Sequence, residues 1–330
     1  MSVTFFGGFY MYDDIPNFLR EFLLYMQNIK NRSQSTIREY HYDLRDTFRF
    51  LKLYKLDKIK LSAIDNELIE KTDISNLDLE FVRKIELTDL YEYLNYLSNV
   101  RSDKPATRAR KIAAIKSFFN YMTFKQKALE KNPAVELETP KLGKRLPKYL
   151  SLDESVALLH SIEGKNEKRD TCIITLFLNC GLRLSELVAI NFKDIKDNTL
   201  KVIGKGDKER SVYLNDACQK ALKEYISVRP KDVKDHDALF ISERGTRIGK
   251  RTVEMMVKKY ITLAGLDPKK YSPHKLRHTA ATLMHKYGGV DIRSLQQILG
   301  HESVSTTEIY THVDSEQVKE ALEKNPLNNL

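Results

Sequence analysis

Apolar residues recur at intervals of three and four through most of the first 125 residues. Such stripes are typical of amphipathic helices that pack on one face. They predict helices at about residues 15–29, 33–53, 87–97 and 107–124. Residues 57–86 are more acidic and have a weaker pattern, so they are predicted to be a longer connection that holds strand-like or short helical pieces. Residues 1–125 are therefore predicted to form an all-helical domain.

A basic, proline-containing stretch follows this domain. Its prolines, Pro133, Pro140 and Pro147, disfavour helix at their own positions and at the residues before them. Residues 126–148 are therefore predicted to be an extended linker. Its positive charges, which include Lys144 and Arg145, are suited to following a nucleic-acid backbone.

The remainder, residues 149–330, mixes helical stripes with short β-type runs. Runs at 199–203 and 210–214 predict a hairpin, and a further short strand is predicted at 237–241. Helices are predicted at residues 169–179, 185–191, 217–227, 252–264, 272–288 and 291–299, with shorter ones from 305 and 315. The predicted fold class is mainly α, with a helical N-terminal domain and a mixed α+β domain that contains a small antiparallel sheet.

Composition adds a basic charge and excludes several classes of protein. Lysine and arginine number 55 against 45 aspartates and glutamates, a formal charge of +10. This favours a polyanionic partner, although a merely basic soluble protein has the same property. The three cysteines show no CxxC pairing, which indicates reduced thiols rather than disulfides or a zinc cluster. No signal-peptide pattern and no apolar run of about 18 residues is present, so a cytoplasmic protein without membrane insertion is predicted.

Positive charge is concentrated around the start of the fourth predicted helix. Residues 101–127 contain eight basic residues and one acidic residue. A helix with this charge is a candidate for following phosphates or entering a groove of DNA, while the alternative is a solvated basic face. The candidate DNA-binding residues are Thr107, Arg108, Arg110 and Lys111.

The second half carries residues that suit the cleavage of a phosphodiester. Tyr310 is a candidate nucleophile, because a phenolate attacks well and can later leave, which makes a covalent step reversible. Arg183 and Arg277 suit a clamp on phosphate, since a guanidinium binds two oxygens in a fork. Lys205, between glycines at the predicted hairpin tip, is suited to protonating the departing 5′ oxygen.

Two histidines and a glutamate complete the candidate site. His274 lies three residues before Arg277 on one predicted helix, and His301 directly follows a glycine at a helix end. Glu186, three residues after Arg183, is a candidate to orient an arginine or histidine. His274 and His278 are spaced like zinc ligands, but the HExxH glutamate and a third ligand are missing, so no metal site is predicted. Each residue alone has an ordinary structural explanation, and the combination carries the hypothesis.

The combination resembles the tyrosine recombinase, or phage integrase, family. The matching motifs are GLRLSEL around Arg183, GKGDKER around Lys205, SPHKLRHTAATLM around His274 and Arg277, and LGHESVSTTEIYTHV around His301 and Tyr310. The resemblance implies a helical, SAM-like core-binding domain followed by a catalytic domain. It also implies that Arg183, Lys205, His274, Arg277 and His301 activate a DNA phosphate, and that Tyr310 forms a 3′-phosphotyrosyl link.

The family resemblance further implies partners and a biological role. Family members act as tetramers on two double-stranded DNA sites and exchange strands through a Holliday junction. They need no metal or nucleotide cofactor. The segment after Tyr310 resembles one that docks into a neighbouring subunit. The two-domain layout is most similar to the Xer group, which resolves chromosome dimers with a septal DNA translocase during cell division. Alternatives are an integrase or resolvase of a mobile element, a type IB topoisomerase, and a DNA-binding protein that has lost catalysis. Residues 57–86 are longer than the corresponding part of a typical Xer protein.

Overall fold

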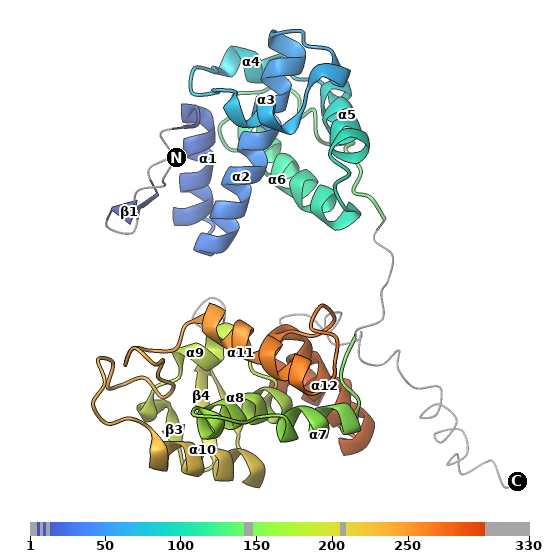
Figure 1. The fold of residues 1–330 in the computed structure, drawn as a ribbon. Helices are drawn as coiled ribbons and strands as arrows, with labels where there is room; N and C mark the ends of the chain where they lie inside the picture. Colours follow the sequence, from blue (N-terminus) through green and yellow to red (C-terminus); the bar gives the residue numbers. More distant parts are fainter. Residues whose placement is uncertain (1–4, 7–8, 11–13, 142–147, 205–208, 301–330) are drawn as a thin grey trace, which may run out of the picture. The chain divides into compact units, whose positions relative to one another are not determined.

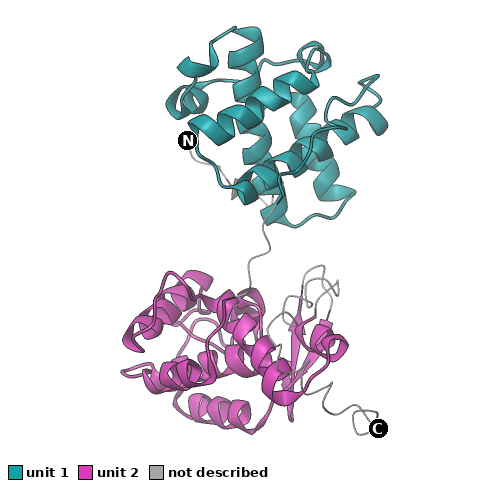
Figure 2. Ribbon diagram, turned by 90° about the vertical axis from the view of Figure 1, so that its right-hand side faces the viewer, with its two compact units in different colours: residues 1–144 teal, residues 145–330 magenta. Residues whose placement is uncertain are grey.

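The computed structural model describes residues 5–6, 9–10, 14–141, 148–204 and 209–300 (Figure 1). The chain divides into two compact units, Met1–Lys144 and Arg145–Leu330 (Figure 2). The expected sites Lys144, Arg145, Lys205, His301 and Tyr310 lie outside the described residues, as do the helices expected from 305 and 315. In the part of the chain that is described, no helix is both long and apolar enough to span a membrane.

Unit 1 is built from helices, with one short hairpin near its N-terminus. Its elements are β1 (Phe5–Phe6), β2 (Phe9–Tyr10), α1 (Asn17–Asn28), α2 (Gln34–Leu51), η1 (Lys52–Leu56), η2 (Leu61–Ala63), α3 (Asn66–Lys71), α4 (Leu79–Arg83), α5 (Leu87–Asn95), η3 (Tyr96–Val100) and α6 (Pro105–Phe124). The four predicted helices are confirmed. The weakly patterned stretch 57–86 forms two short α-helices and a 3-10 turn, so its helical interpretation is correct and its strand-like interpretation is wrong.

Local sequence explains where these helices begin. The side chain of Ser33 accepts a hydrogen bond from the Thr36 amide at the start of α2, and Asp65 and Asp78 cap α3 and α4 in the same way. Pro105 occupies the first turn of α6, where its missing N–H costs nothing. The apolar faces of α1, α2 and α6 then meet in an aromatic core, in which the ring centroid of Phe48 lies 5.3 Å from that of Phe118.

Unit 2 combines helices with a small antiparallel sheet. Its elements are α7 (Leu152–His160), α8 (Glu167–Cys180), α9 (Leu184–Ala189), η4 (Phe192–Asp194), β3 (Ile195–Lys196), β4 (Thr199–Ile203), β5 (Glu209–Tyr213), α10 (Asp216–Val228), α11 (Lys250–Leu263), α12 (Pro273–Gly288) and α13 (Ile292–Leu299). The strands pair in the order β3-β4-β5, and Val202 on β4 lies opposite Arg210 on β5. Helix α8 is buried along most of its length and packs against α10 and α12 (Figure 1).

The predicted strand at 237–241 is wrong. Only single bridges form here, between Asn191 and Ala238 and between Ile241 and Arg247. The Arg229 guanidinium donates to the carbonyls of Ala238 and Leu239, at 2.7 and 3.1 Å. These donors take up carbonyl groups that a neighbouring strand would otherwise engage, and the segment stays an irregular connection.

Candidate active site

Arg183 and Glu186 are brought together by the turn between α8 and α9. Gly181 ends α8 with a φ of +59°, a left-handed conformation that glycine adopts without strain. Arg183 is the N-cap residue of α9, and Glu186 is in its first turn. One Glu186 oxygen accepts a hydrogen bond from the Arg183 amide at 2.7 Å, and the other lies 2.8 Å from Arg183 Nη1. The turn therefore orients the Arg183 side chain.

Arg277 reaches the same place from α12. The residue is 3% exposed, and its guanidinium donates to the carbonyls of Gly181 and Leu299, each at 2.6 Å. Its Nη1 also lies 3.8 Å from Glu186 Oε2. Two arginines that are far apart in sequence thus meet around one buried carboxylate.

The C-terminal end of α13 completes this cluster. Leu299 O accepts from Arg277, and Gly300 O accepts from Arg183 Nη2 at 2.8 Å. The last carbonyls of a helix carry partial negative charge, which favours cations beside them. These hydrogen bonds therefore fix the backbone at Leu299 and Gly300, which directly precede His301 in the sequence.

Arg210 is a member of the cluster that the sequence analysis did not single out. It lies on β5 and forms a two-point ion pair with Glu186, with Nη1–Oε1 and Nη2–Oε2 distances of 2.6 and 3.0 Å. The only signal in the sequence was its place at the end of the GKGDKER motif. Its contact with Glu186 depends on how the sheet packs beside α9, which spacing alone does not reveal.

The electrostatics of the cluster are dominated by positive charge. Burial opposes ionisation of Glu186, but hydrogen bonds from Arg210 and from the Arg183 amide, together with the charge of Arg210, outweigh it and hold the pKa of Glu186 below its ordinary value. Glu186 is therefore a carboxylate at neutral pH. Among the described residues of the cluster, three guanidiniums and one carboxylate have a formal net charge of +2, which favours an anionic ligand.

His274 lies next to this cluster near the start of α12. Its Nε2 is 3.0 Å from Nε2 of His278, so one of the two rings accepts this hydrogen bond and is neutral. Desolvation of the imidazole and the positive charges of Lys275, Arg277 and Arg183 lower the pKa of His274 below 6.5. A neutral His274 at pH 7 can donate one hydrogen bond to a phosphate oxygen. Within the described ranges, no three His, Cys, Asp or Glu side chains gather closely enough to hold a metal ion.

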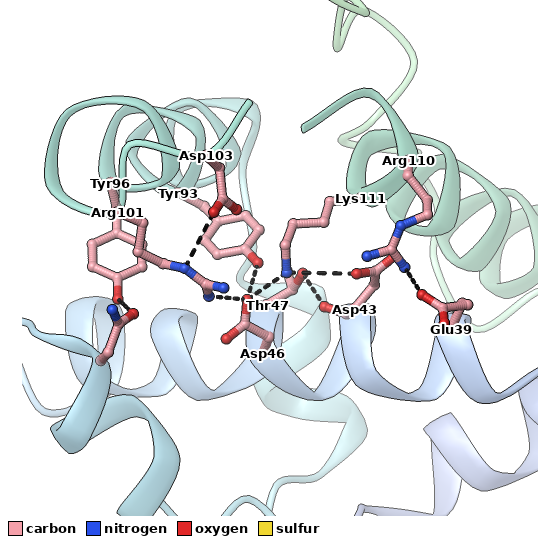
Figure 3. Close-up of polar contacts among 11 residues, drawn as sticks. Glu39, Asp43, Asp46, Thr47, Tyr93, Tyr96, Arg101, Asp103, Arg110 and Lys111 are labelled. Carbon is pink, nitrogen blue, oxygen red and sulfur yellow. Dashed lines mark hydrogen bonds and ion pairs between the residues drawn. The ribbon is translucent and has the colours of Figure 1, made fainter. Parts of the chain in front are cut away.

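The candidate DNA-binding residues of α6 have unequal surroundings. Lys111 is 4% exposed, and its ammonium lies 2.6 Å from Asp46 Oδ2 and 3.5 Å from Asp43 Oδ1 (Figure 3). It was expected to face DNA, but the structure turns it into unit 1, because α6 buries this face against α2. A phosphate contact would require breaking both ion pairs.

Thr107, Arg108 and Arg110 remain more accessible than Lys111. Arg110 is on the surface and pairs with Glu39 and Asp43, in each case at 2.7 Å (Figure 3). Arg108 donates through Nη1 to Ser98 Oγ, and Thr107 is partly exposed. The Arg110–Glu39 pair is exposed on both sides, so it contributes little free energy and exchanges readily for a phosphate, whereas the Asp43 partner is buried. These three residues stay predicted DNA contacts.

Comparisons with known proteins agree with this arrangement. A model described as "Phage integrase family" matches residues 148–317, and one described as "Phage integrase, N-terminal SAM-like domain" matches residues 19–79. Tyrosine recombinase XerC of Caldanaerobacter subterraneus subsp. tengcongensis is 54% identical over 94% of this chain and 87% of its own length. Tyrosine recombinase XerD of Proteus mirabilis is 36% identical over 82% of this chain and 84% of its own length.

A solved structure supports the same assignment. The XerH site-specific recombinase bound to a palindromic difH substrate is 25% identical, with a TM-score of 0.65 over 93% of this chain and 94% of that chain. The Xer relatives do not favour the integrase, resolvase and topoisomerase alternatives. The chain therefore belongs to the phage integrase family, and it is a Xer-type tyrosine recombinase, an enzyme that cleaves and rejoins DNA at specific sites.

Proposed function

We propose that the cluster around Glu186 binds the scissile DNA phosphate and that Arg183 and Arg277 hold its non-bridging oxygens. The observation that carries this proposal is the convergence of both guanidiniums on one buried carboxylate, Glu186. A guanidinium stays protonated even when it is desolvated, and its fork matches two phosphate oxygens. Charge–charge attraction is also stronger in such a site than in water.

The reaction assigned to this site is a reversible transesterification. The Tyr310 phenol gives its proton to solvent, the phenolate oxygen attacks the phosphorus to form a 3′-phosphotyrosyl bond, and the bond to the 5′ oxygen of the next nucleotide breaks. Lys205 gives its proton to this departing oxygen, while Arg183, Arg277, His274 and His301 stabilise the charge on the phosphorane-like transition state. The roles of Lys205, His301 and Tyr310 rest on their sequence motifs. These steps need no metal ion and no nucleotide cofactor.

The proposed biological reaction is the resolution of chromosome dimers. It rests on the relatives named XerC and XerD, and on the XerH structures with difH substrates. Four subunits, identical or of two kinds, would act on two double-stranded DNA sites through a Holliday junction, with the segment after Tyr310 docked into a neighbouring subunit. A DNA translocase at the septum is the proposed activating partner. The enzyme would act in the cytoplasm, associated with DNA.

The proposed division of labour between the domains follows the family pattern. Residues 1–125 form the core-binding domain, and contact DNA through Thr107, Arg108 and Arg110. Residues 126–148 form a linker whose Lys144 and Arg145 follow the backbone. Residues 149–330 form the catalytic domain. Because Lys111 is engaged inside unit 1, it supports α6 rather than contacting phosphate directly.

The test is to trap the covalent intermediate. Genomic fragments retained by the full-length protein would first be sequenced to obtain the site, and a duplex of that site nicked close to the scissile phosphate would then be offered. The wild type should accumulate a covalent protein–DNA adduct, since the short cleaved strand diffuses away. Y310F should form none while binding the duplex with unchanged affinity, because only the phenol oxygen is lost. Y213F, at a tyrosine that is 69% exposed, is the matched control and should react normally. An adduct that survives in Y310F would overturn the assignment.

A further inference from the structure

Arg210 connects three segments of unit 2 through a single guanidinium. From β5, its Nη1 and Nη2 reach the Glu186 carboxylate at 2.6 and 3.0 Å, and its Nε donates to Ile298 O on α13 at 3.3 Å. The side chain is 14% exposed. Every nitrogen of the guanidinium is therefore engaged with the cluster that contains Arg183 and Arg277.

Gly300 provides the space that this arrangement needs. A Cβ atom at Gly300 would lie 3.0 Å from Arg210 Cδ and 3.3 Å from both Nε and Nη1. Gly300 also has a φ of +64°, which a residue with a side chain adopts only with strain. The close approach of Arg210 to the end of α13 thus depends on the missing side chain and the positive φ of Gly300. Gly300 directly precedes His301 in the sequence.

The contacts of Glu186 are divided unequally between its partners. Arg210 engages both carboxylate oxygens, whereas the Arg183 side chain engages only Oε1 and uses Nη2 for Gly300 O. A guanidinium and a carboxylate otherwise tend to form a two-point pair that neutralises both charges. Without Arg210, Arg183 is the guanidinium best placed to form such a pair with Glu186. The Glu186 carboxylate would then neutralise the charge of Arg183, which would no longer be available to the substrate.

We propose that Arg210 is a positioning residue that serves as the counter-ion of Glu186, so that Arg183 and Arg277 retain their full positive charge for the reacting phosphate. A DNA phosphodiester carries one negative charge, and attack by a phenolate brings a second into the transition state. The +2 charge of the cluster matches this charge, and removal of Arg210 would reduce it to +1. This inference rests on the proposed function of the cluster.

The test asks whether E186Q, which slows cleavage by the wild type, instead accelerates cleavage in the R210Q variant. R210Q removes the charge but keeps a hydrogen-bond donor for Glu186, and it should slow single-turnover cleavage of the nicked duplex by about 100-fold at saturating protein. E186Q should slow the wild-type enzyme, because Glu186 orients Arg183. In the R210Q background, the same substitution restores the +2 charge and should accelerate cleavage by about tenfold. R210K keeps the charge and should cleave within about tenfold of the wild type.

Two measurements separate this effect from a loss of structure. The affinity for the intact duplex should change by no more than about threefold in any variant, because binding is spread over many phosphate contacts. Circular dichroism reports whether each variant is folded; if R210Q is not, R210K decides, since a charge role requires it to stay active. The proposal is overturned if R210Q cleaves at the wild-type rate, if E186Q slows both backgrounds, or if a folded R210K is inactive. Every variant in this test keeps Tyr310, and its rate of adduct formation is compared with that of the wild type. A result that overturns the role of Arg210 is therefore distinct from the survival of an adduct in Y310F, which would overturn the proposed function.

Discussion

The Nζ atom of Lys111 on α6 lies 2.6 Å from Oδ2 of Asp46 on α2, in the interior of unit 1 (Figure 3). The same oxygen also accepts from the Tyr93 hydroxyl and from Arg101 Nη1, each at 2.8 Å. One basic residue of α6, Lys111, thus anchors the helix to α2 through an ion pair. This relationship separates the residues that hold α6 in place from those that are able to reach a phosphate.

The first prediction concerns the stability of unit 1. K111M leaves Asp43 and Asp46 buried without their shared cation, and it should lower the free energy of unfolding by about 3 kcal/mol. The chain has no tryptophan, so a Y40W reporter on α2, where Tyr40 packs beside Phe22, follows urea unfolding of unit 1 alone. K116M, at a more exposed lysine of the same helix, is the control and should change little. Unchanged stability of K111M together with a weaker, less salt-dependent affinity for duplex DNA would instead support a phosphate contact.

The second prediction concerns pH. Burial raises the pKa of Asp43 from 3.8 to about 6, despite the nearby charges of Lys111 and Arg110. Because the folded state holds this proton more tightly than the unfolded state, the stability due to Asp43 is fully present below pH 4. It is lost as the pH rises through about 6, by about 3 kcal/mol in total.

The measurement is a comparison of the wild type with D43N, both carrying Y40W. The stability of the wild type relative to D43N should fall from about pH 4 to about pH 7 and then stay level up to pH 8. Titrations at other carboxylates cancel in this difference. A relative stability that rises over the same range would show that Lys111 and Arg110 dominate and that the pKa of Asp43 is lowered.

The third prediction concerns the leaving group. If Lys205 protonates the departing 5′ oxygen, K205A should slow cleavage of ordinary DNA by about 100-fold or more. A 5′-thio substrate needs no proton, since a thiolate leaves readily, so K205A should cleave it at nearly the wild-type rate. The measurement is single-turnover cleavage of both nicked duplexes by K205A and by K201A, a control at a half-exposed lysine of β4. Equal slowing of the two substrates by K205A would remove it as the general acid.

Periodicity and motifs in the chain were sufficient to identify most helices, the hairpin strands and the family. Helix α12 illustrates the reason: Ser272 and Pro273 mark its start, its apolar stripe continues to Gly288, and Gly289 ends it in a left-handed conformation. Signals of this kind act within a few residues, so they can be read without knowing the tertiary structure. The motifs around Arg183 and Arg277 were visible in the same way, because they are short runs of consecutive residues.

Tertiary packing alone decided which charges meet. In the sequence, Lys111 and Arg110 are adjacent basic residues, yet the packing of α6 on α2 buries the first between two aspartates and leaves the second on the surface. Arg210 likewise looks like an ordinary strand residue in the sequence. In the structure, its guanidinium pairs with Glu186 of α9, in a space that a side chain at Gly300 would narrow. The free energy of a buried charge depends on partners that arrive from distant segments, and the pattern along the chain carries no record of those partners.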